Sequence, residues 1–386
     1  MFKKLIGMQE ALATLMAISK PMARSERIPA RDALGRVLSE SIVSDANLPQ
    51  FNRAAMDGFA VRSSDTRGAS PTNPVFLRIG KDCISVRTGM AVNDGYDAVV
   101  MLEDATLRED RLEVTAVVHP FRNLSRIGED VAAGDLIMDE GHHLRPPDIA
   151  LLAALGISKV TVYSKPRIAI IPTGGELIPV GLRELEPGEA YEINGLMAEL
   201  YIEKWGGVPL RRCIVPDESR LIRQAIESEL DADMIVLIGG TSVGEKDYAP
   251  RTLADLGQLL VHGVRIQPGK PTAFGIVEDK VVVCLPGYPV AAFVDLYLFV
   301  RAVLKKMAHL DDGVPKVNAV LSRKVVSRPG YLSIVRIKIE GEAAVPLMTS
   351  GAGILSSLAR ADGFVIVPEE LEGIEAGQTV EVTLIE

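Results

Sequence analysis

The sequence contains few of the residues that mark several common classes of protein. Only three cysteines occur, Cys83, Cys213 and Cys284, and they lie too far apart for a disulfide framework or a zinc site. We therefore expect buried, reduced thiols and a cytoplasmic location. No apolar run reaches the roughly 18–20 residues that a membrane-spanning helix needs, so we expect no association with a membrane.

The sequence also has fewer basic than acidic residues. The 42 lysines and arginines stand against 51 acidic residues, which gives a formal net charge of −9 at pH 7. Nucleic-acid binding depends on a cationic surface, so we expect no nucleic-acid partner. A small anionic ligand remains compatible with this charge, because a local group of backbone N–H donors can hold phosphate on an acidic protein.

The usual signatures of nucleotide-binding and catalytic sites are also absent. The sequence has no GxxxxGK[ST] motif, and no GxGxxG motif follows its first predicted strand. The adjacent pair His142 and His143 has no evident third ligand, so we do not predict a metal site there. No combination of serine, histidine and aspartate indicates a hydrolytic triad.

Apolar periodicity predicts a protein of several domains with an α/β and β fold. From residue 166 to about 308, buried strands alternate with amphipathic helices, which indicates a central, open, mostly parallel α/β sheet. Short apolar runs separated by turn residues predict a small β domain inserted near the N-terminus and a β module at the C-terminus. The expected domains are residues 1–50 with 138–164 (a discontinuous N-terminal and linker domain), 51–137 (the inserted β domain), 165–309 (the α/β domain) and 310–386 (the C-terminal β domain).

Three glycine-rich loops follow strands of the α/β segment, at residues 173–176, 239–247 and 285–289. Ligands of open α/β sheets bind at the carboxyl ends of the strands, where glycine lets backbone N–H groups approach a phosphate closely. The turn PGKP adds a positive charge, although a surface lysine is the simpler interpretation. The residues that we expect to bind substrate are Gly174, Gly175, Gly239, Gly240, Ser242, Gly244, Lys270, Pro286, Gly287 and Pro289.

Acidic residues occur in two of these loops, namely Glu176, Glu245 and Asp247, and Asp217 follows the predicted strand VPLRRCIV. Loop carboxylates are often solvated or cap helices, but several of them around one anion would repel it unless a cation intervenes. Mg²⁺ bridges carboxylates and phosphates, so we predict Mg²⁺ as a cofactor, held by Asp217 and Asp247. These residue patterns predict an anion-binding α/β domain without naming its reaction.

The order of the motifs is more specific. The segments LPQFNRAAMDGFAVR and SVRTGMAVNDGYDAVVMLED precede PTGGEL, EINGLMAEL, VPDE, GGTSVGEKDY, PGKPTAFG and LPGYPVAA, and GILSSLARADGFVIVP comes near the C-terminus. In this order the sequence resembles the molybdopterin molybdenumtransferases over residues 8–385. The C-terminal region of gephyrin resembles the same family.

The resemblance implies an enzyme that inserts molybdate into adenylylated molybdopterin, releases AMP and needs a divalent cation. It also implies a homodimer of elongated four-domain subunits. The family's site positions correspond to Asp57, Thr88, Glu176, Asp217, Asp247 and Arg336. Because subunits of the family are expected to exchange surfaces, Asp57, Thr88 and Arg336 are expected to serve the partner's α/β domain.

Three positions depart from the family pattern. Gln267 and Gly263 stand where lysines are frequent, and Ala352 replaces a serine. Arg265 lies between the first two and is a candidate to compensate for them, although its reach differs from that of lysine. These departures leave two alternatives to molybdate insertion: a paralogue specific for tungstate, or a non-catalytic molybdopterin-binding or scaffold protein.

Overall fold

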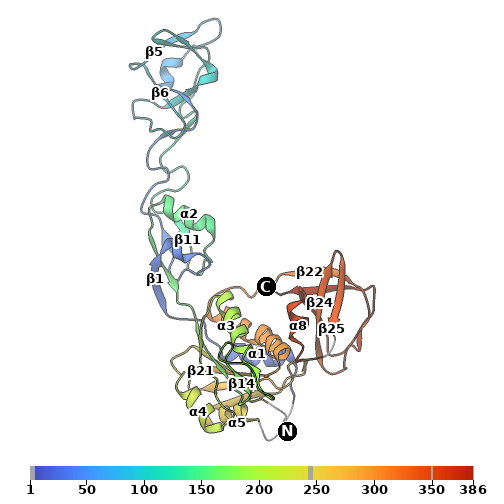
Figure 1. Ribbon diagram of the computed structural model, residues 1–386. Coiled ribbons are helices and arrows are strands. Elements are labelled where there is room, and N and C mark those ends of the chain that lie inside the picture. The colour runs from blue at the N-terminus through green and yellow to red at the C-terminus, as the bar shows by residue number, and fades with distance from the viewer. Residues whose placement is uncertain (1–4, 242–246, 349–350, 386) are drawn as a thin grey trace. The chain divides into compact units, whose positions relative to one another are not determined.

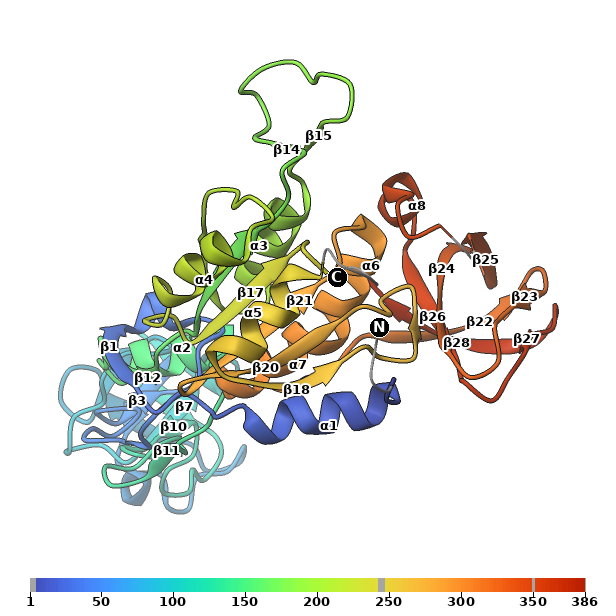
Figure 2. The same cartoon turned by 90° about the horizontal axis from the view of Figure 1, so that it is seen from below.

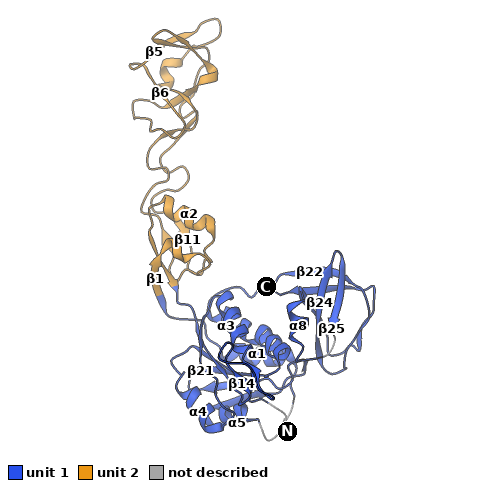
Figure 3. Cartoon of the chain, in the orientation of Figure 1, with its two compact units in different colours: residues 1–25, 163–386 blue, residues 26–162 orange. Residues whose placement is uncertain are grey.

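The computed structural model describes residues 5–241, 247–348 and 351–385, and the predicted substrate residues Ser242 and Gly244 lie outside these ranges. The chain divides into two compact units, one of residues 1–25 with 163–386 and one of residues 26–162 (Figure 3). Among the described residues, no helix combines the length and the hydropathy needed to cross a membrane.

A mixed six-stranded sheet forms the centre of the first unit, in the order β16-β13-β17-β21-β20-β18. Strands β16, β13, β17 and β21 run parallel, whereas β20 and β18 pair in antiparallel fashion. The predicted α/β sheet is therefore present, with four of its six strands parallel. The strands are β13 (Arg167–Pro172), β16 (Val208–Arg211), β17 (Met234–Ile238), β18 (Gln258–His262), β20 (Ala273–Val277) and β21 (Lys280–Leu285).

Helices cover both faces of this sheet, as Figure 2 shows. Alternate residues of one strand enter two different cores: Ile168 and Ile170 belong to one and Ala169 and Ile171 to the other. Such all-apolar strands are what a sheet buried on both faces requires. The helices of the first face are α1 (Met8–Ile18), α3 (Asn194–Lys204), α6 (Pro289–Asp295) with the π-helical turn η4 (Leu296–Val300), and α7 (Arg301–Met307); those of the second are α4 (Ser219–Glu227) and α5 (Tyr248–Leu256).

The N-terminal helix packs with the α/β domain. Ala11 and Leu15 of α1 are fully buried in the same core as Trp205, the single tryptophan, which is 1% exposed. Residues 1–25 therefore cluster with the α/β part of the chain. This differs from the expected assignment of residues 1–50 to the linker domain, because an amphipathic helix packs where its apolar face is buried.

The C-terminal segment forms a closed β-barrel (Figure 1). The ring runs β24-β25-β22-β28-β26, and β26 pairs again with β24. Strand β19 of the preceding segment adds to β24 in parallel register, with Gln267 opposite Ser333. The elements are β19 (Ile266–Gln267), β22 (Lys316–Leu321), β23 (Val325–Val326), β24 (Leu332–Glu340), β25 (Ala343–Met348), α8 (Leu355–Ala359), β26 (Gly363–Val367), β27 (Gly373–Ile374) and β28 (Thr379–Leu384).

The second unit contains two three-stranded sheets, β6-β4-β7 and β5-β9-β8, whose apolar residues share a core. A separate core joins α2 to β11 and β12. The elements are β1 (Ser25–Pro29), β2 (Ile42–Val43), β3 (Arg53–Ala54), β4 (Gly58–Val61), β5 (Val75–Arg78), β6 (Cys83–Val86), β7 (Ala98–Met101), β8 (Ala105–Arg108), β9 (Arg111–Val114), β10 (Leu124–Ser125), β11 (Leu136–Met138), α2 (Pro146–Ala154) and β12 (Lys159–Tyr163), with short 3-10 turns at Ala30–Ala33, Ser63–Thr66 and Leu102–Asp104.

The three cysteines are free thiols. Cys83 and Cys284 are buried as expected, and burial raises the pKa of the Cys83 thiol to about 11. The expectation is wrong for Cys213, which is exposed. This residue follows β16, an edge strand of the sheet, so nothing covers it in the way that neighbouring strands cover Cys284.

Candidate functional site

The loops after β13, β17 and β21 surround a pocket of about 440 Å³ at the carboxyl edge of the parallel strands. The loop after β13 contributes Thr173 and Glu176, and Asp217 lines the pocket beside them. The remaining loops supply Gly239, Gly240 and Thr241 after β17, and Gly287, Tyr288 and Pro289 after β21. The sequence pattern therefore correctly placed three glycine-rich loops around one cavity.

The floor of the pocket depends on glycine. The backbone N–H of Thr173 donates to the carbonyl of Ile238 at 2.8 Å, which holds the ends of β13 and β17 together. Gly239 follows with a φ of +103°, and a Cβ at this position would lie 2.2 Å from the carbonyl oxygen of Thr173. Only glycine permits this approach, so the polar backbone of both loops remains at the surface of the pocket.

Two of the predicted carboxylates face this pocket. Glu176 is exposed at its rim, whereas Asp217 is half-buried. A Cβ on Gly240 would lie 3.4 Å from Oδ1 of Asp217, so this carboxylate sits against the second glycine of the β17 loop. Of the other residues predicted to bind substrate, Gly174 and Pro286 are buried within their loops, whereas Gly175 is exposed.

Asp247 lies at the N-terminal end of α5 and is 6% exposed. Its Oδ2 is 2.7 Å from Nε2 of His262 on β18. Burial, together with the charge of Asp247, raises the pKa of the Cys284 thiol, which places this carboxylate close to β21. His262 was not predicted, and the only signal for it is a histidine within the otherwise apolar strand segment LLVHGV.

Polar residues at the start of α3 connect this helix to the third loop and to Arg211. Nδ2 of Asn194, the first residue of α3, donates to the carbonyl of Gly287 at 2.7 Å. Glu192 accepts the backbone N–H of Gly195 at 2.6 Å and Nη2 of Arg211 at 2.5 Å. Asn194 and Glu192 both line the pocket. The motif EINGLMAEL contains these residues, but no pattern in the sequence assigns them a role.

The basic residues are arranged differently from the acidic ones. Lys270 is half-buried on the turn after β19, Gln267 is exposed and Gly263 is buried. The guanidinium of Arg265 contacts Glu369 through both carboxylate oxygens, at 2.9 and 3.3 Å, and also donates to the carbonyl of Leu5. Arg265 therefore links β19 to the C-terminal segment. The guanidinium that was a candidate to compensate for the basic positions at Gln267 and Gly263 is thus paired with Glu369 in this structure.

Asp57 and Thr88, two of the site positions that the family resemblance implies, lie together in the unit of residues 26–162. Oδ1 of Asp57 accepts the backbone N–H of Thr88 at 2.7 Å and its hydroxyl at 2.8 Å. These two hydrogen bonds, the backbone one first, hold the pKa of the Asp57 carboxyl below its ordinary value. Both residues are exposed, so the pair presents a preformed anionic group to any ligand or partner.

The C-terminal residues of the predicted site occupy two places. Arg336 is buried on β24, and burial lowers the pKa of its guanidinium. Ala352, which replaces a serine of the family, uses its carbonyl to accept the backbone N–H of Val290 at 2.9 Å. The loop around Ala352 therefore lies beside the start of α6, next to the third loop of the pocket.

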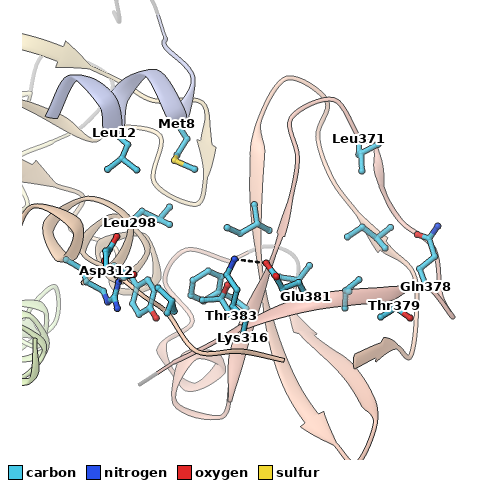
Figure 4. A pocket seen from close by; sticks show the side chains of 18 residues that line it. Met8, Leu12, Leu298, Asp312, Lys316, Leu371, Gln378, Thr379, Glu381 and Thr383 are labelled. Carbon is cyan, nitrogen blue, oxygen red and sulfur yellow. Dashed lines mark hydrogen bonds and ion pairs between the residues drawn. The ribbon is translucent and has the colours of Figure 1, made fainter. Parts of the chain in front are cut away.

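A larger hollow of about 720 Å³ lies between α1, the helix that ends at Met307 and the C-terminal barrel (Figure 4). Its wall is largely aliphatic, from Met8 and Leu12 on one side to Leu371 on the other, and its charged residues include the ion pair Lys316–Glu381. None of the predicted site residues lines it. Size alone therefore does not identify the site, whereas the polar loops around the smaller pocket do.

The residues present can be tested against the predicted Mg²⁺. Among the described residues, no group of three or more histidine, cysteine or acidic side chains forms a complete cage. Mg²⁺ commonly needs only one or two carboxylates, with substrate phosphate and water as its other ligands. Asp217 at the pocket and Asp247 at the start of α5 provide this number, with one oxygen of Asp247 close to His262. Of these two residues only Asp217 lines the pocket, so a Mg²⁺ ion there would depend on phosphate and water for most of its ligands.

Comparisons with known proteins cover almost the whole chain. Residues 6–156 match the MoeA N-terminal region (domain I and II), residues 169–306 match a probable molybdopterin binding domain, and residues 318–385 match the MoeA C-terminal region (domain IV). The second of these regions contains all the described residues that line the 440 Å³ pocket.

Individual relatives agree with this assignment. A putative molybdopterin biosynthesis protein from Methanocaldococcus jannaschii is 38% identical, with 92% of this chain and 90% of the relative covered. A molybdopterin molybdenumtransferase from Haemophilus influenzae is 32% identical, with coverages of 92% and 93%. The crystal structure of a molybdopterin biosynthesis protein from Pyrococcus horikoshii aligns with a TM-score of 0.86 at 33% identity over 99% of both chains. The chain therefore belongs to the molybdopterin molybdenumtransferase family of enzymes.

Proposed function

We propose that the chain inserts molybdate into adenylylated molybdopterin with release of AMP. The convergence of three glycine-rich loops and the acidic residues Glu176 and Asp217 on one pocket carries this proposal. Exposed backbone and threonine hydroxyls suit a phosphorylated ligand, and carboxylates suit the N–H groups of a pterin ring or a bridging cation. Family membership supplies the chemistry that such a ligand undergoes.

The reaction breaks the phosphoanhydride between molybdopterin and AMP, and most of its catalysis is expected to come from positioning and charge neutralisation. The loops around Gly239 and Gly287 would bind the phosphates, and Lys270 would add a positive charge. Asp217 and Asp247 would hold Mg²⁺. The cation would neutralise charge between these carboxylates and the substrate phosphates.

We further propose a homodimer in which Asp57, Thr88 and Arg336 of one subunit complete the pocket of the other. The preformed and exposed Asp57–Thr88 pair supports this idea, because two hydrogen bonds hold the carboxylate at the surface, where a second subunit can reach it. The two buried, free thiols Cys83 and Cys284 are compatible with a cytoplasmic location, which we also propose.

The basic residues of the site leave two alternatives to molybdate insertion, namely a preference for tungstate and binding without turnover. Because Gln267 and Gly263 bring no charge and Arg265 is paired with Glu369, the site has fewer cationic groups than the family pattern. A chain of this kind could prefer tungstate, or bind molybdopterin without turnover. We favour molybdate insertion because the acidic set and all three loops of the pocket are retained.

The experiment is AMP release from adenylylated molybdopterin, with molybdate and tungstate titrated in parallel, with and without Mg²⁺. The proposal expects release that depends on both the oxyanion and the cation. It also expects that Asp217→Asn and Asp247→Ala lose AMP release. The exposed control Asp255→Asn should release AMP as the unchanged protein does. Binding without release would establish the non-catalytic alternative, and release with tungstate alone would establish the tungstate-specific one.

A further inference from the structure

The buried acid Asp295 connects helix α6 with the turn of residues 267–272. Asp295 is the last residue of α6, the helix that begins at Pro289 in the third loop of the pocket, and it is 0% exposed. Its Oδ2 accepts or donates a very short hydrogen bond with the hydroxyl of Thr272. Thr272 belongs to the turn of residues 267–272, which also carries Lys270. No motif of the sequence pointed to Asp295.

The hydrogen-bond geometry indicates which form of the acid is present. Oγ1 of Thr272 lies within hydrogen-bond distance of both Asp295 Oδ2 and the carbonyl of Gly269, the latter at 2.7 Å. A hydroxyl has one proton to donate, and the Gly269 carbonyl can only accept it. A protonated Asp295 resolves the conflict: its O–H donates to Thr272, and the Thr272 hydroxyl donates to Gly269.

Two further observations agree with a neutral acid. In the described part of the chain, Oδ1 of Asp295 has no hydrogen-bond partner, which would be very costly for an ionised carboxylate in an apolar core. Burial raises the pKa of Asp295 well above its ordinary value, and the Thr272 contact opposes this shift only in part. No charged side chain is among the causes of the shift.

The surroundings of Asp295 contain few charges. Residues 289–300 have no other charged side chain, and Lys270 is the only one in the turn of residues 267–272. Of the other elements packed on α6, α8 has none and β21 has only Lys280, at its first residue. The acids of α3 lie away from the core, Glu203 being exposed and Glu199 paired with Arg211.

The carboxyl group also fixes the backbone of the turn. Gly269 has a φ of +125°, and a Cβ there would lie 2.2 Å from Oδ1 of Asp295. On the other side, the carbonyl of Lys270 accepts the backbone N–H of Val264 at 3.0 Å. The turn is therefore held between α6 and the segment before β19, with Lys270 between the two contacts.

We propose that Asp295 is a positioning residue: as a neutral carboxylic acid it holds the turn of residues 267–272 and so fixes the backbone that carries Lys270, the cation that the proposed function assigns to the anionic ligand. The identity of that ligand rests on the proposed function, whereas the protonated state of Asp295 does not. Asp295 itself contacts no ligand in this account.

The test is a double-mutant cycle on the affinity for molybdopterin, measured by equilibrium binding. Asp295→Asn keeps a donor to Thr272 without charge and should bind within about twofold of the unchanged protein. Asp295→Leu removes the hydrogen bond and should bind about tenfold more weakly, as should Thr272→Val, which guards against poor folding of the leucine variant. In a Lys270→Met background, Asp295→Leu should cause no further loss.

Two results would overturn the proposal. If Asp295→Leu weakens binding as much in the Lys270→Met background as in the unchanged protein, Asp295 does not act through Lys270. If Asp295→Asn binds as poorly as Asp295→Leu, the ionised acid is the functional form. Should the unchanged protein bind no molybdopterin, the proposed function fails, and the pH dependence of unfolding of Asp295→Asn still decides whether the acid is neutral.

Discussion

Replacing Asp295 by asparagine should stabilise the protein, and the gain should grow as the pH rises. The folded protein keeps a proton on Asp295 that the unfolded chain releases above the ordinary pKa of 3.8. The folded state therefore binds one proton more, and the free energy of unfolding falls as the pH increases. Asparagine does not titrate, so the variant loses this pH dependence.

The magnitude follows from proton linkage. One proton held only by the folded state costs about 1.4 kcal/mol of stability per pH unit. The difference in unfolding free energy between Asp295→Asn and the unchanged protein should therefore widen by about 1.4 kcal/mol per unit above roughly pH 4–5. It should stop widening at the pH where the folded protein itself loses the proton. For a unit of this size, about 1 kcal/mol corresponds to a change in Tm of roughly 2–4 °C.

The assay is thermal unfolding of both proteins from pH 5 to pH 8 in buffers of equal ionic strength. The unit of residues 26–162 does not contain Asp295, so its transition serves as an internal reference where the two transitions separate. Asp255→Asn is the matched control, because the Asp255 side chain is 70% exposed and its replacement should leave the pH dependence unchanged.

A constant difference in Tm across this range would refute the reasoning. It would mean that Asp295 is ionised in the folded protein despite its burial and its unpaired oxygen. A lower stability of Asp295→Asn at every pH would contradict it as well, because the amide would then fail to replace the acid as the donor to Thr272.

Three further predictions concern other parts of the site. Thr88→Val removes the hydroxyl that donates to Asp57 and keeps the backbone N–H, so the pKa of Asp57 should rise. The acidic limb of the pH profile of AMP release should then move to higher pH, and an unchanged limb would show that Asp57 does not determine it. Gln267→Lys should lower the molybdate concentration needed for half-maximal release, and no change would show that this departure is harmless. Glu369→Gln should cost only about 0.5 kcal/mol in urea unfolding, because the Arg265–Glu369 pair is about one-third exposed; a loss of several kcal/mol would contradict this.

The central sheet and its pocket could be predicted from the sequence because their signals are local. The strands before Thr173, Gly239 and Pro286 are short and apolar except for Arg167 and Lys280, the first residues of two of them. Glycine-rich or proline-containing loops follow these strands, and parallel strands bring their carboxyl ends together. The family resemblance named Asp57 and Thr88 as site positions, but their contact across 31 residues of sequence became evident only in the structure.

Other features depend on tertiary packing that the sequence does not encode locally. The pattern of α1 predicts an amphipathic helix but not the domain that buries Ala11 and Leu15. A count of basic residues cannot show that Glu369 neutralises Arg265, which is 104 residues away. Asp295 gave one weak signal, a single acid in the apolar run PVAAFVDLYLFV, and neither Gly269 nor Thr272 could be identified as its neighbour from the sequence.

The central claim is that the pocket formed by the three loops binds molybdopterin, and a steric block tests it most directly. Gly287 lines the pocket, and the nearest atom to a Cβ there would be the Cα of Gly239 at 3.7 Å, so the backbone accepts a Cβ and a leucine side chain would take up space intended for the ligand. Gly95 offers a matched control, with no atom within 4 Å of a Cβ. Molybdopterin should bind Gly287→Leu at least about tenfold more weakly than the unchanged protein, and Gly95→Leu with unchanged affinity. Equal affinity of all three proteins would contradict the assignment of this pocket.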